Sequence, residues 1–457
     1  MSEEATLDEF TNSEESVESS KGGLIDDSLY PEEWDVVNFE ELIEDIRYGT
    51  DTKSNTKENG YPTLRIPNIV EKRITTQDLK YTPLNEGEFE RLKLENGDIL
   101  LIRTNGNPAY VGRCAVFDAE LDDCIFASYL IRIRLDEDSS LSEFVSAFLN
   151  SHLGRQEMSG WISTSAGNHN MGISAIEKFS VPLPKYVEQR KIATVLYTVD
   201  QAVEKTEEII DQTERVRRGY IKQQVLALDS DCDRQESVVG TRRVLIPDSW
   251  ETVRLGDVAR IVSGKSFPRD YQEGHAGSRA VIKVEDMNLP GNDKYIEEVT
   301  NRVTDEVLDE LSKNIFPENT VIHPRVGEAL LLNKTRITGE DAAFDDNIMG
   351  WVPEGINPEY LYYASTLIDF NAVAQTGTVP SINKEMAANF RFPLPPEEEQ
   401  KRIARDISRV DGQISIYEEE KNQLQRLKRG LMQDLLSGKV RTTDTNIEVP
   451  EHIMQHG

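Results

Sequence analysis

Few residues of this chain have the types and spacing that catalysis or metal binding requires. The cysteines, Cys114, Cys124 and Cys232, form no CxxC pair, and the six histidines are scattered, so no zinc site is predicted. There is no Ser/His/Asp arrangement, no pair of carboxylates set among apolar residues and no convincing nuclease pattern of the PD-(D/E)xK type. The sequence therefore predicts neither a catalytic site nor a metal site.

Two short motifs resemble parts of base-binding or nucleotide-binding loops, and both fit turns better. Asn107–Tyr110 (NPAY) resembles the NPPY-type loop with which amino-methyltransferases hold a flipped base. It lacks the second proline, and no upstream glycine-rich loop offers a place for a methyl donor. Gly264–Ser266 (GKS) resembles the end of a P-loop, but Ala259 stands where the earlier glycine is required. We interpret both motifs as ordinary turns.

Basic side chains gather instead in loops rich in Gly and Asn, in both halves of the chain. Arg and Lys can hydrogen-bond base edges in the major groove and hold phosphates. We expect roughly a third of them to contact DNA and the others to be solvated surface charge. The candidates are Lys53, Lys57, Arg65, Lys72, Arg73, Arg103, Arg113, Lys265, Arg269, Arg279, Lys283, Arg325, Lys334 and Arg336.

The overall charge opposes a nucleic-acid partner at low salt. The chain has 51 basic and 82 acidic residues, a net charge of −31, and its first 20 residues include no base. In molar salt the Debye length falls to about 3 Å, so surface acids scarcely repel DNA and keep the protein hydrated. We therefore expect a salt-loving source. Since no apolar run approaches the roughly 20 residues of a membrane span, and no signal peptide is apparent, we expect a cytoplasmic protein.

The elements that position these loops occur twice, at an offset of 211 residues. Phe179–Ala193 reads FSVPLPKYVEQRKIA, and Phe390–Ala404 reads FRFPLPPEEEQKRIA. A shared register of this length implies two copies of one structural unit. A weaker repeat opens each half, with Trp34 in the first copy and Trp250 in the second.

After each PLP, apolar residues at alternating steps of three and four predict a long amphipathic helix. About 40 residues correspond to roughly 60 Å. The simplest way to bury both stripes is to pack the helices against each other in antiparallel orientation; the alternative is two independent helices that each cap their own module. The packing candidates are Ile192, Leu196, Val199, Val203, Val216, Tyr220, Ile403, Ile407, Val410, Ile414, Leu424, Leu427 and Leu431.

Each helix follows about 150 residues of mixed pattern, in which short apolar runs alternate with Gly, Pro, Asn and Asp turns. We expect an α/β fold with two globular modules, separated by two long antiparallel helices that form a coiled-coil-like spacer with pseudo-two-fold symmetry.

This organisation resembles the specificity subunits of type I restriction-modification systems. The resemblance rests on the duplicated F-x-(V/F)-PLP-x3-EQ-(R/K)-(K/R)-IA segment and covers the chain from about Tyr30 to Arg441. The ending Leu431–Arg441 (LMQDLLSGKVR) is typical of the second helix of that family. Gly97–Gly112 contains the strand-turn segment of the family, whereas Glu318–Gly327 departs from it, with Glu-Asn in place of Gly-Asp.

The resemblance implies a non-catalytic subunit that recognises double-stranded DNA. Each module would be a target recognition domain for one half of a split, asymmetric sequence, and the helices would set the spacing and dock two methyltransferase subunits, joined by restriction subunits. S-adenosylmethionine, ATP and Mg would belong to those partners. The expected boundaries are a disordered acidic tail at 1–25, recognition domain 1 at 26–184, spacer helix 1 at 185–230, a linker at 231–245, recognition domain 2 at 246–395, spacer helix 2 at 396–441 and a flexible tail at 442–457.

Two other classes of function stay open on the sequence alone. One is a self-contained DNA adenine methyltransferase that uses Asn107–Tyr110, which binding of S-adenosylmethionine by the isolated chain would favour. The other is a duplicated coiled-coil interaction protein with no DNA role.

Overall fold

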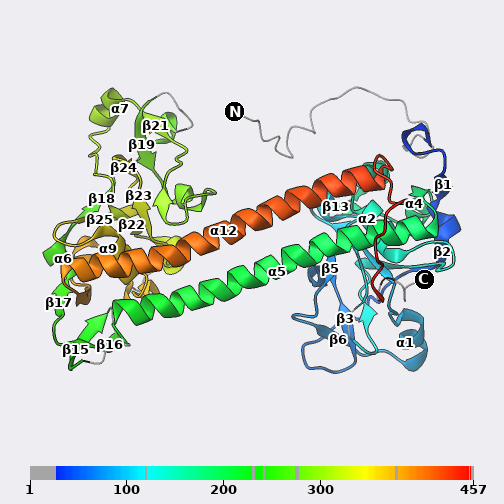
Figure 1. Cartoon of the computed structure of the whole chain (residues 1–457), viewed down its shortest axis with the longest axis horizontal. Helices are drawn as coiled ribbons and strands as arrows, with labels where there is room; N and C mark the ends of the chain where they lie inside the picture. Colours follow the sequence, from blue (N-terminus) through cyan, green and yellow to red (C-terminus); the bar gives the residue numbers. More distant parts are fainter. Residues whose placement is uncertain are drawn as a thin grey trace. The chain divides into compact units, whose positions relative to one another are not determined.

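The computed structural model describes residues 27–70, 72–118, 121–165, 167–228, 232–239, 242–272, 277–375, 379–451 and 453. They form two compact units (Figure 1). Each unit has its own hydrophobic core. Unit 1 comprises Met1–Lys205 and Lys421–Gly457, and unit 2 comprises Thr206–Glu420. The acidic tail expected at 1–25 lies outside the described residues.

Unit 1 is built around a four-stranded antiparallel sheet in the order β2-β11-β7-β9. Its central strand β7 reads ILLI and is fully buried, as expected for a short run of branched apolar residues covered on both faces. The strands of unit 1 are β1 (Asp35–Asn38), β2 (Ile43–Tyr48), β3 (Tyr61–Leu64), β4 (Ile69–Val70), β5 (Arg73–Ile74), β6 (Lys80–Thr82), β7 (Ile99–Ile102), β8 (Thr104–Asn105), β9 (Cys114–Val116), β10 (Ile125–Phe126), β11 (Leu130–Leu135), β12 (Ser163–Ser165), β13 (Asn168–Asn170) and β14 (Ser180–Leu183). Its shorter helices are η2 (Asp27–Leu29), η3 (Phe39–Leu42), η4 (Ile66–Asn68), α1 (Glu86–Leu92), η5 (Pro108–Tyr110), α2 (Ser142–Leu149), α3 (His152–Ser159) and α4 (Ile173–Ile176).

Unit 2 has a five-stranded sheet in the order β18-β25-β22-β23-β20. The strands of unit 2 are β15 (Arg234–Val239), β16 (Arg242–Pro247), β17 (Glu251–Arg254), β18 (Ala259–Ser263), β19 (Arg279–Ile282), β20 (Tyr295–Ile296), β21 (Arg302–Val303), β22 (Val321–Pro324), β23 (Arg336–Thr338), β24 (Ala342–Phe344), β25 (Ile348–Pro353) and β26 (Arg391–Leu394). Its shorter helices are α6 (Leu255–Val258), η6 (Arg269–Tyr271), η7 (Val284–Asn288), α7 (Asp305–Glu310), α8 (Gly327–Leu331), α9 (Pro358–Ser365), α10 (Phe370–Val373) and α11 (Lys384–Ala388).

The two units repeat one strand topology. The sheet β10-β3-β6 in unit 1 has a parallel pair followed by an antiparallel pair, and β24-β19-β21 in unit 2 has the same pattern. Strand β1 pairs with β14 and β17 pairs with β26, each time joining the segment after a tryptophan to the strand that contains the first two residues of PLP. The duplication therefore extends through modules whose sequences repeat only in outline.

A glycine is required at the same place in both units. Gly49 follows β2 and Gly264 follows β18. A Cβ atom at Gly49 would lie 2.3 Å from the carbonyl oxygen of Phe126, and one at Gly264 would lie 2.0 Å from that of Asp345. Only glycine allows the backbones to approach so closely.

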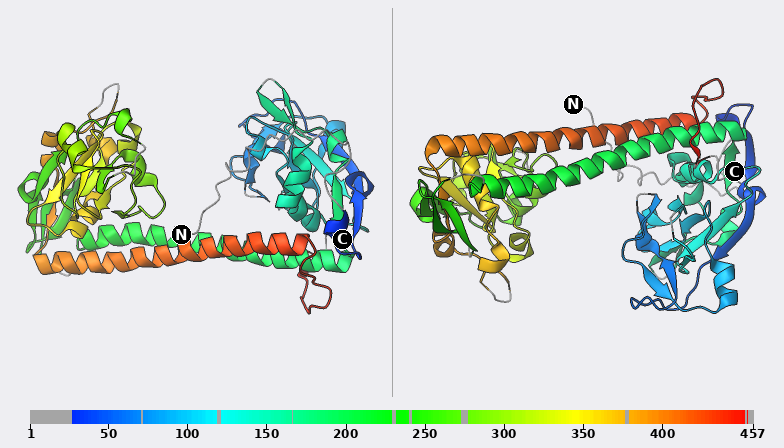
Figure 2. Two further views of the ribbon diagram at one scale, coloured as in Figure 1. Left: turned by 90° about the horizontal axis from the view of Figure 1, so that it is seen from above. Right: turned by 60° about the horizontal axis from the view of Figure 1, so that its bottom comes forward.

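Two helices of 40 residues, α5 (Tyr186–Val225) and α12 (Glu397–Leu436), contribute to both units. In unit 1 the start of α5 lies beside the end of α12, and in unit 2 the end of α5 lies beside the start of α12 (Figures 1 and 2). Lys428 binds Asp200 in unit 1, and Arg217 binds Asp411 at 2.5 Å in unit 2. Asp411 follows Asp200 by 211 residues, and Lys428 follows Arg217 by the same number, so the two ion pairs are equivalent in the repeat. The helices therefore pair antiparallel in both units, as the sequence predicts.

The repeated glutamine of the EQ motif links the start of each long helix to its module. Gln189 and Gln400 are buried, and their Nε2 atoms donate to the carbonyls of Pro184 and Pro395 at 2.9 and 2.8 Å. Their Oε1 atoms accept the backbone N–H that precedes a short helix, from Leu141 before α2 at 2.9 Å and from Asn357 before α9 at 2.8 Å. One side chain thus satisfies polar groups of both the PLP turn and the module.

The predicted helix stripes are buried in part. Ile192, Leu196, Val203, Ile403, Ile407 and Ile414 are buried; Val199, Val410, Tyr220, Leu424 and Leu431 are half-buried.

Val216 and Leu427 were expected to pack against the other helix, but they are 60% and 52% exposed. Each lies directly before the basic residue, Arg217 or Lys428, that binds the opposite helix. Successive residues of a helix point about 100° apart, so the charged pair takes the position facing the partner helix and turns the apolar neighbour outward. The prediction was wrong at both positions for the same reason.

The segment after α12 makes many contacts within unit 1, in contrast to the flexible tail expected there. Arg441 binds the buried carboxylate of Glu188 at 2.8 Å and Glu33 at 2.9 Å. Lys191 donates to three backbone carbonyls, those of Thr442, Thr443 and Thr445. Ile453 is fully buried in the core of unit 1.

None of the described helices combines the length and the apolar character that crossing a bilayer would need.

Candidate nucleic-acid interface

In unit 1, polar strands form a small surface sheet in the order β12-β13-β8. Its exposed and half-buried residues are Ser, Thr, Asn and His, and the Thr164 hydroxyl lies 3.1 Å from Nδ1 of His169. Strand β13 pairs antiparallel with β8, with His169 opposite Asn105 and Asn170 opposite Thr104. Side chains of this kind can form hydrogen bonds with base edges and phosphates. Here none of them is buried.

Two arginines close in sequence to β8 lie on tyrosine rings. The guanidinium of Arg103 is 4.5 Å from the ring centre of Tyr48, and that of Arg113 is 4.1 Å from the ring centre of Tyr110. Among the described residues, neither arginine forms an ion pair with a carboxylate. Tyr48, Tyr110 and Tyr129 are exposed. This region therefore presents positive charge and aromatic faces to solvent, and both can contact nucleic acid.

Asn107–Tyr110 forms a turn, as the sequence interpretation predicts. Oδ1 of Asn105 accepts the N–H of Asn107 at 2.9 Å, and Oδ1 of Asn107 accepts the N–H of Ala109 at 3.0 Å. Residues Pro108–Tyr110 are the short helix η5, with Asn107 as its cap. The asparagine side chain is engaged in holding the turn, which explains its position without any catalytic role.

Unit 2 holds Arg325 in the backbone position that Arg103 has in unit 1. The N–H of Arg103 donates to Tyr129 at 3.0 Å, and the N–H of Arg325 donates to Asn347 at 2.9 Å. The carbonyls of both arginines accept a backbone N–H of the returning segment, from Met171 in unit 1 and from Ile382 in unit 2. The same loop framework thus presents an arginine in both units.

The surroundings of the two arginines differ in charge. A cavity of about 310 Å³ in unit 2 is lined by Lys283, Glu285, Glu328, Asp345 and Asn347, next to the loop of Arg325. Unit 1 has aromatic rings beside its arginine, whereas unit 2 has carboxylates in the cavity next to the loop of its arginine. The two frameworks therefore offer different hydrogen-bonding surfaces.

The GKS motif of unit 2 belongs to this framework and not to a P-loop. The backbone N–H of Lys265 donates to the carbonyl of Phe344, and its Nζ donates to the carbonyl of Ser312. The next helical element is the three-residue η6, which is too short to hold phosphates at its N-terminus.

The structure separates the fourteen basic candidates by their contacts. Arg65, Arg73, Arg279 and Lys283 form ion pairs with acidic side chains. Arg336 and Lys265 donate to backbone carbonyls, Lys334 contacts Asn288, and Lys72 contacts Sδ of Met432. Exposed or half-buried, with no acidic partner among the described residues, are Lys53, Lys57, Arg103, Arg113, Arg269 and Arg325.

Arg73 is placed away from the expected surface. It donates to the backbone carbonyl of Asp200 at 3.1 Å and binds the carboxylate of Glu204 at 3.1 Å, both on α5. Its role in this structure is to join the module to the helix. Nothing in the local sequence could indicate this contact, because its partners lie far along the chain.

Sequence reasoning missed Tyr48, Tyr129 and the polar strand pair β12-β13. The only available signal was the run STSAGNHN (Ser163–Asn170), in which Ala-Gly separates two short polar stretches, as in a hairpin. In the part of the chain that the structure describes, no group of three or more His, Cys, Asp or Glu side chains is placed to hold a metal ion.

Comparisons with known proteins assign this architecture to a family. The model described as type I restriction modification DNA specificity domain matches twice, at residues 31–215 and 247–426. These matches cover most of the chain and follow its duplication, so the chain belongs to this family. It is a specificity subunit of the type I restriction-modification class, as the sequence motifs predict, and this family of DNA-recognition domains is not catalytic.

Individual relatives agree with this assignment. The chain is 25% identical over 420 residues to the putative type I restriction enzyme MjaX specificity subunit of Methanocaldococcus jannaschii, which covers 90% of this chain and 94% of that one. It is 31% identical over 157 residues to the EcoKI specificity subunit of Escherichia coli, covering 34% of each chain.

Solved structures agree in fold. A chain from a type I R-M system superposes with a TM-score of 0.52 at 17% identity, over 90% of this chain and 99% of that one. The S subunit from M. genitalium superposes with a TM-score of 0.50 at 15% identity, over 88% of this chain and 96% of that one.

Proposed function

We propose that the chain reads a split, asymmetric DNA sequence, with the module of unit 1 recognising one half and the module of unit 2 recognising the other. The observation that carries this proposal is one loop framework, built around Arg103 and Arg325, with different side chains in each copy. Because the two loops share one backbone geometry, we expect both modules to approach duplex DNA in the same way. Because their side chains differ, we expect the two half-sites to differ in sequence.

The direct test is selection from a random DNA library by the full chain together with its methyltransferase subunits. We expect enrichment of two different short sequences at a fixed separation. Enrichment of a single uninterrupted site, or of two identical half-sites, would contradict the proposal.

The proposed partners are two methyltransferase subunits and restriction subunits, which would dock on α5 and α12. S-adenosylmethionine, ATP and Mg would then act in those partners. The relative from M. jannaschii is named a specificity subunit of a restriction enzyme, which supports partners of this kind. A cytoplasmic location, where host DNA is accessible, follows from the same role.

The two helices would act as a ruler between the half-sites. A helix of 40 residues is about 60 Å long, and half-sites read on one face of DNA lie roughly 34 Å apart. Removing seven residues from each helix, within Thr194–Arg218 and the corresponding part of α12, keeps the phase of the apolar stripe. We expect it to shorten the spacing by about three base pairs and to leave both half-sites unchanged.

A matched control removes four residues from α5 alone, which breaks the phase of the helix pair and should abolish assembly. A seven-residue deletion that altered base preference at unchanged spacing would refute the ruler.

We propose further that the protein works at high salt. The support is its net charge of −31. Thermal unfolding in dilute buffer and in about 2 M KCl tests this, since screening of surface acids should raise the melting temperature. A lower melting temperature at high KCl would contradict it.

At high salt, phosphate contacts contribute little to affinity, so base contacts should dominate. We expect the logarithm of DNA affinity to fall with the logarithm of salt by a slope equivalent to fewer than about eight ion contacts.

A further inference from the structure

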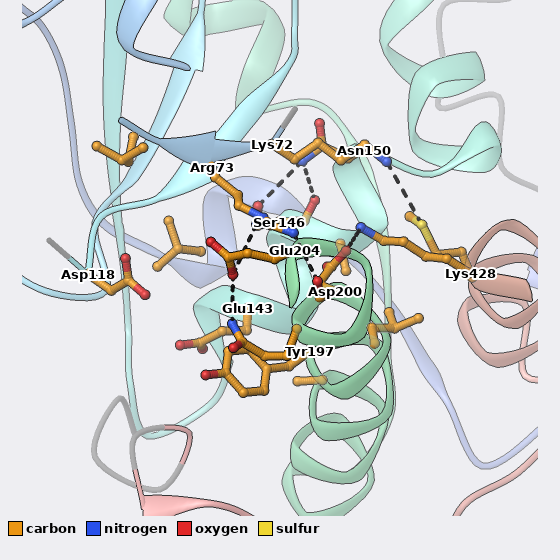
Figure 3. A pocket seen from close by; sticks show the side chains of 17 residues that line it. Lys72, Arg73, Asp118, Glu143, Ser146, Asn150, Tyr197, Asp200, Glu204 and Lys428 are labelled. Atoms are coloured by element: carbon orange, nitrogen blue, oxygen red, sulfur yellow. Dashed lines mark hydrogen bonds and ion pairs between the residues drawn. The ribbon is translucent and has the colours of Figure 1, made fainter. Parts of the chain in front are cut away.

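Unit 1 contains a cavity of about 380 Å³ between its module and the helices (Figure 3). Ala147 of α2, Leu196 of α5 and Met432 of α12 contribute apolar surface to it. Asp200 and Glu204 of α5 and Arg73 of β5 contribute charged groups. The cavity is independent of the proposed DNA-reading loops, because none of the β8, β12 or β13 residues lines it.

The duplication identifies the corresponding place in unit 2. Helices α2 and α9 both have eight residues, and each begins after the backbone N–H that a buried glutamine accepts. Counting from that point, Ser146 and Ala147 are the fifth and sixth residues of α2, and Tyr362 and Tyr363 are the fifth and sixth residues of α9. Two small residues in unit 1 therefore stand where unit 2 has two tyrosines.

The tyrosines of unit 2 show what such a place accommodates. Tyr362 and Tyr363 are buried, and the hydroxyl of Tyr363 donates to Asp411 at 2.5 Å. The same hydroxyl lies 2.9 Å from Nζ of Lys294 and 3.0 Å from the hydroxyl of Ser408. Burial and the neighbouring Asp411 raise the pKa of Tyr363, so it stays a hydrogen-bond donor.

Unit 1 keeps the acceptor but has no tyrosine on α2. Asp200 occupies the helix position of Asp411, 211 residues earlier, and its Oδ1 binds Lys428 as Asp411 Oδ1 binds Arg217. In unit 2 the other carboxylate oxygen, Oδ2 of Asp411, accepts from Tyr363. Figure 3 shows Asp200 and Glu204 directed toward the cavity beside Arg73.

We propose that this cavity binds an aromatic hydroxyl group, either of a small phenol or of a tyrosine from a partner protein. The ring would lie among Ala147, Leu196 and Met432, and the hydroxyl would donate to Asp200. The volume suffices for one aromatic ring, since apolar cavities of about 150 Å³ hold benzene. An occupied cavity would give unit 1 the helix-to-module contact that Tyr363 gives unit 2.

The test measures binding of p-cresol, the side-chain analogue of tyrosine, to the full chain by ligand-observed NMR. We expect saturable binding, and affinity for 4-methylanisole, whose oxygen cannot donate, at least roughly tenfold weaker. Ala147→Tyr should fill the cavity and abolish p-cresol binding, whereas the control Ala147→Ser leaves room and should retain it. Undiminished binding to Ala147→Tyr, or equal binding of both ligands, would overturn the proposal.

A second variant, in unit 2, tests the proposal even if Ala147→Tyr fails to fold. Tyr363→Ala opens the equivalent space in unit 2, and p-cresol should restore part of the lost melting temperature, whereas 4-methylanisole should restore less. If p-cresol restored none of the lost melting temperature, the comparison with the Tyr363 site, on which the proposal rests, would be wrong.

A final arm distinguishes the two sources of the hydroxyl. If methyltransferase subunits displace p-cresol, the natural group is a partner tyrosine; if p-cresol stays bound in their presence, it is a free phenol. Since p-cresol binding to the isolated chain needs neither DNA nor partners, its failure would leave the proposed DNA recognition untouched.

Discussion

The two units place different chemistry at matching positions of one strand topology. In unit 1, Asp98 precedes β7, is 1% exposed and binds Arg134 through both oxygens, at 2.8 and 2.9 Å. In unit 2, Asn319-Thr320 stands in the place of Gly97-Asp98, so the sequence alignment of Glu318-Asn319 with Gly-Asp was wrong by one residue. Thr320 precedes β22, is fully buried, and donates its hydroxyl to the carbonyl of Pro317 at 2.6 Å. An ion pair and a neutral hydrogen bond thus support the same backbone. The backbone hydrogen bonds and buried apolar runs define the fold, and the polar groups at its edges can vary.

The same contrast applies to the loops and to the helix contacts. Arg103 lies on Tyr48, whereas the loop of Arg325 lies beside carboxylates such as Glu328 and Asp345. The EQ glutamines, by comparison, make equivalent bonds in both units. The glutamines that connect module and helix are retained, and positions that face solvent at the loops differ, as expected when one scaffold carries two specificities.

The largest difference between the units concerns the glutamate of the EQ motif. Glu188 is 1% exposed and depends on Arg441 from the segment after α12, whereas Glu399 is half-buried and binds its neighbour Arg402 at 2.7 Å. Arg441→Ala should destabilise unit 1 by about 3 kcal/mol, because a buried carboxylate loses its charged partner. Arg402→Ala should cost less than about 1 kcal/mol.

Urea unfolding of both variants measures this difference. An equal loss in the free energy of unfolding for Arg441→Ala and Arg402→Ala would contradict this prediction. It would mean that Arg441 stabilises unit 1 no more than an ordinary surface ion pair stabilises unit 2.

Acid should affect the two units in different pH ranges. Burial lowers the pKa of His323 on β22 to about 4, and the matching residue of β7 is the buried Leu101. A buried neutral histidine favours the folded state only while it is unprotonated, so unit 2 should lose stability as the pH falls from about 6.5 to about 4, by up to about 3 kcal/mol.

In unit 1, hydrogen bonds from Arg47 and Arg132 lower the pKa of Asp45 to about 2. That contribution is present above about pH 4 and is lost only as the pH falls toward 2. Urea unfolding at pH 7 and pH 4.5 should therefore show a loss in unit 2, which His323→Leu removes. A loss of equal size in His323→Leu would contradict burial of the histidine as its cause.

Recognition of the two half-sites should be separable. Arg103→Ala should weaken DNA binding by about 1–3 kcal/mol and relax base preference in one half-site only, and Arg325→Ala should do so in the other half-site. Arg279→Ala, a control on an arginine that is paired with Asp305, should change neither. Selection from a random library measures all three, and relaxation of both half-sites by one variant would undermine the division between units.

The smallest effect is expected where the units agree. Val216→Ser and Leu427→Ser alter exposed residues at equivalent positions, so each should change the free energy of unfolding by less than about 0.5 kcal/mol. The control Leu196→Ser changes a buried position of the same stripe and should cost about 3 kcal/mol. Urea unfolding distinguishes these outcomes. A large loss at Val216 or Leu427 would place them in the helix seam after all.

The repeat of the sequence was enough to predict the helices, their antiparallel pairing and the α/β character of the modules. These features depend on apolar spacing and on a duplicated motif, which are local signals. Burial at Val216 could not be predicted, because it depends on the charged pair that the next residue makes with the other helix.

The candidate interface was predicted less well, for a related reason. Arg103 and Arg325 were among the expected residues, but Tyr48 reaches Arg103 through strand order, and Arg73 meets α5 across 127 residues of chain. Such contacts are set by topology, which short-range patterns do not encode. The polar strands β12 and β13 contain no apolar residues, so the sequence showed none of the apolar alternation that predicts a strand.

The central claim is that one scaffold reads two different half-sites. Mapping methylated adenines in host DNA, with and without the gene for this chain, tests it most directly. We predict that loss of the gene removes methylation from one split motif, whose two halves differ and which is methylated on both strands. Unchanged methylation, or loss of a motif with two identical halves, would contradict the account.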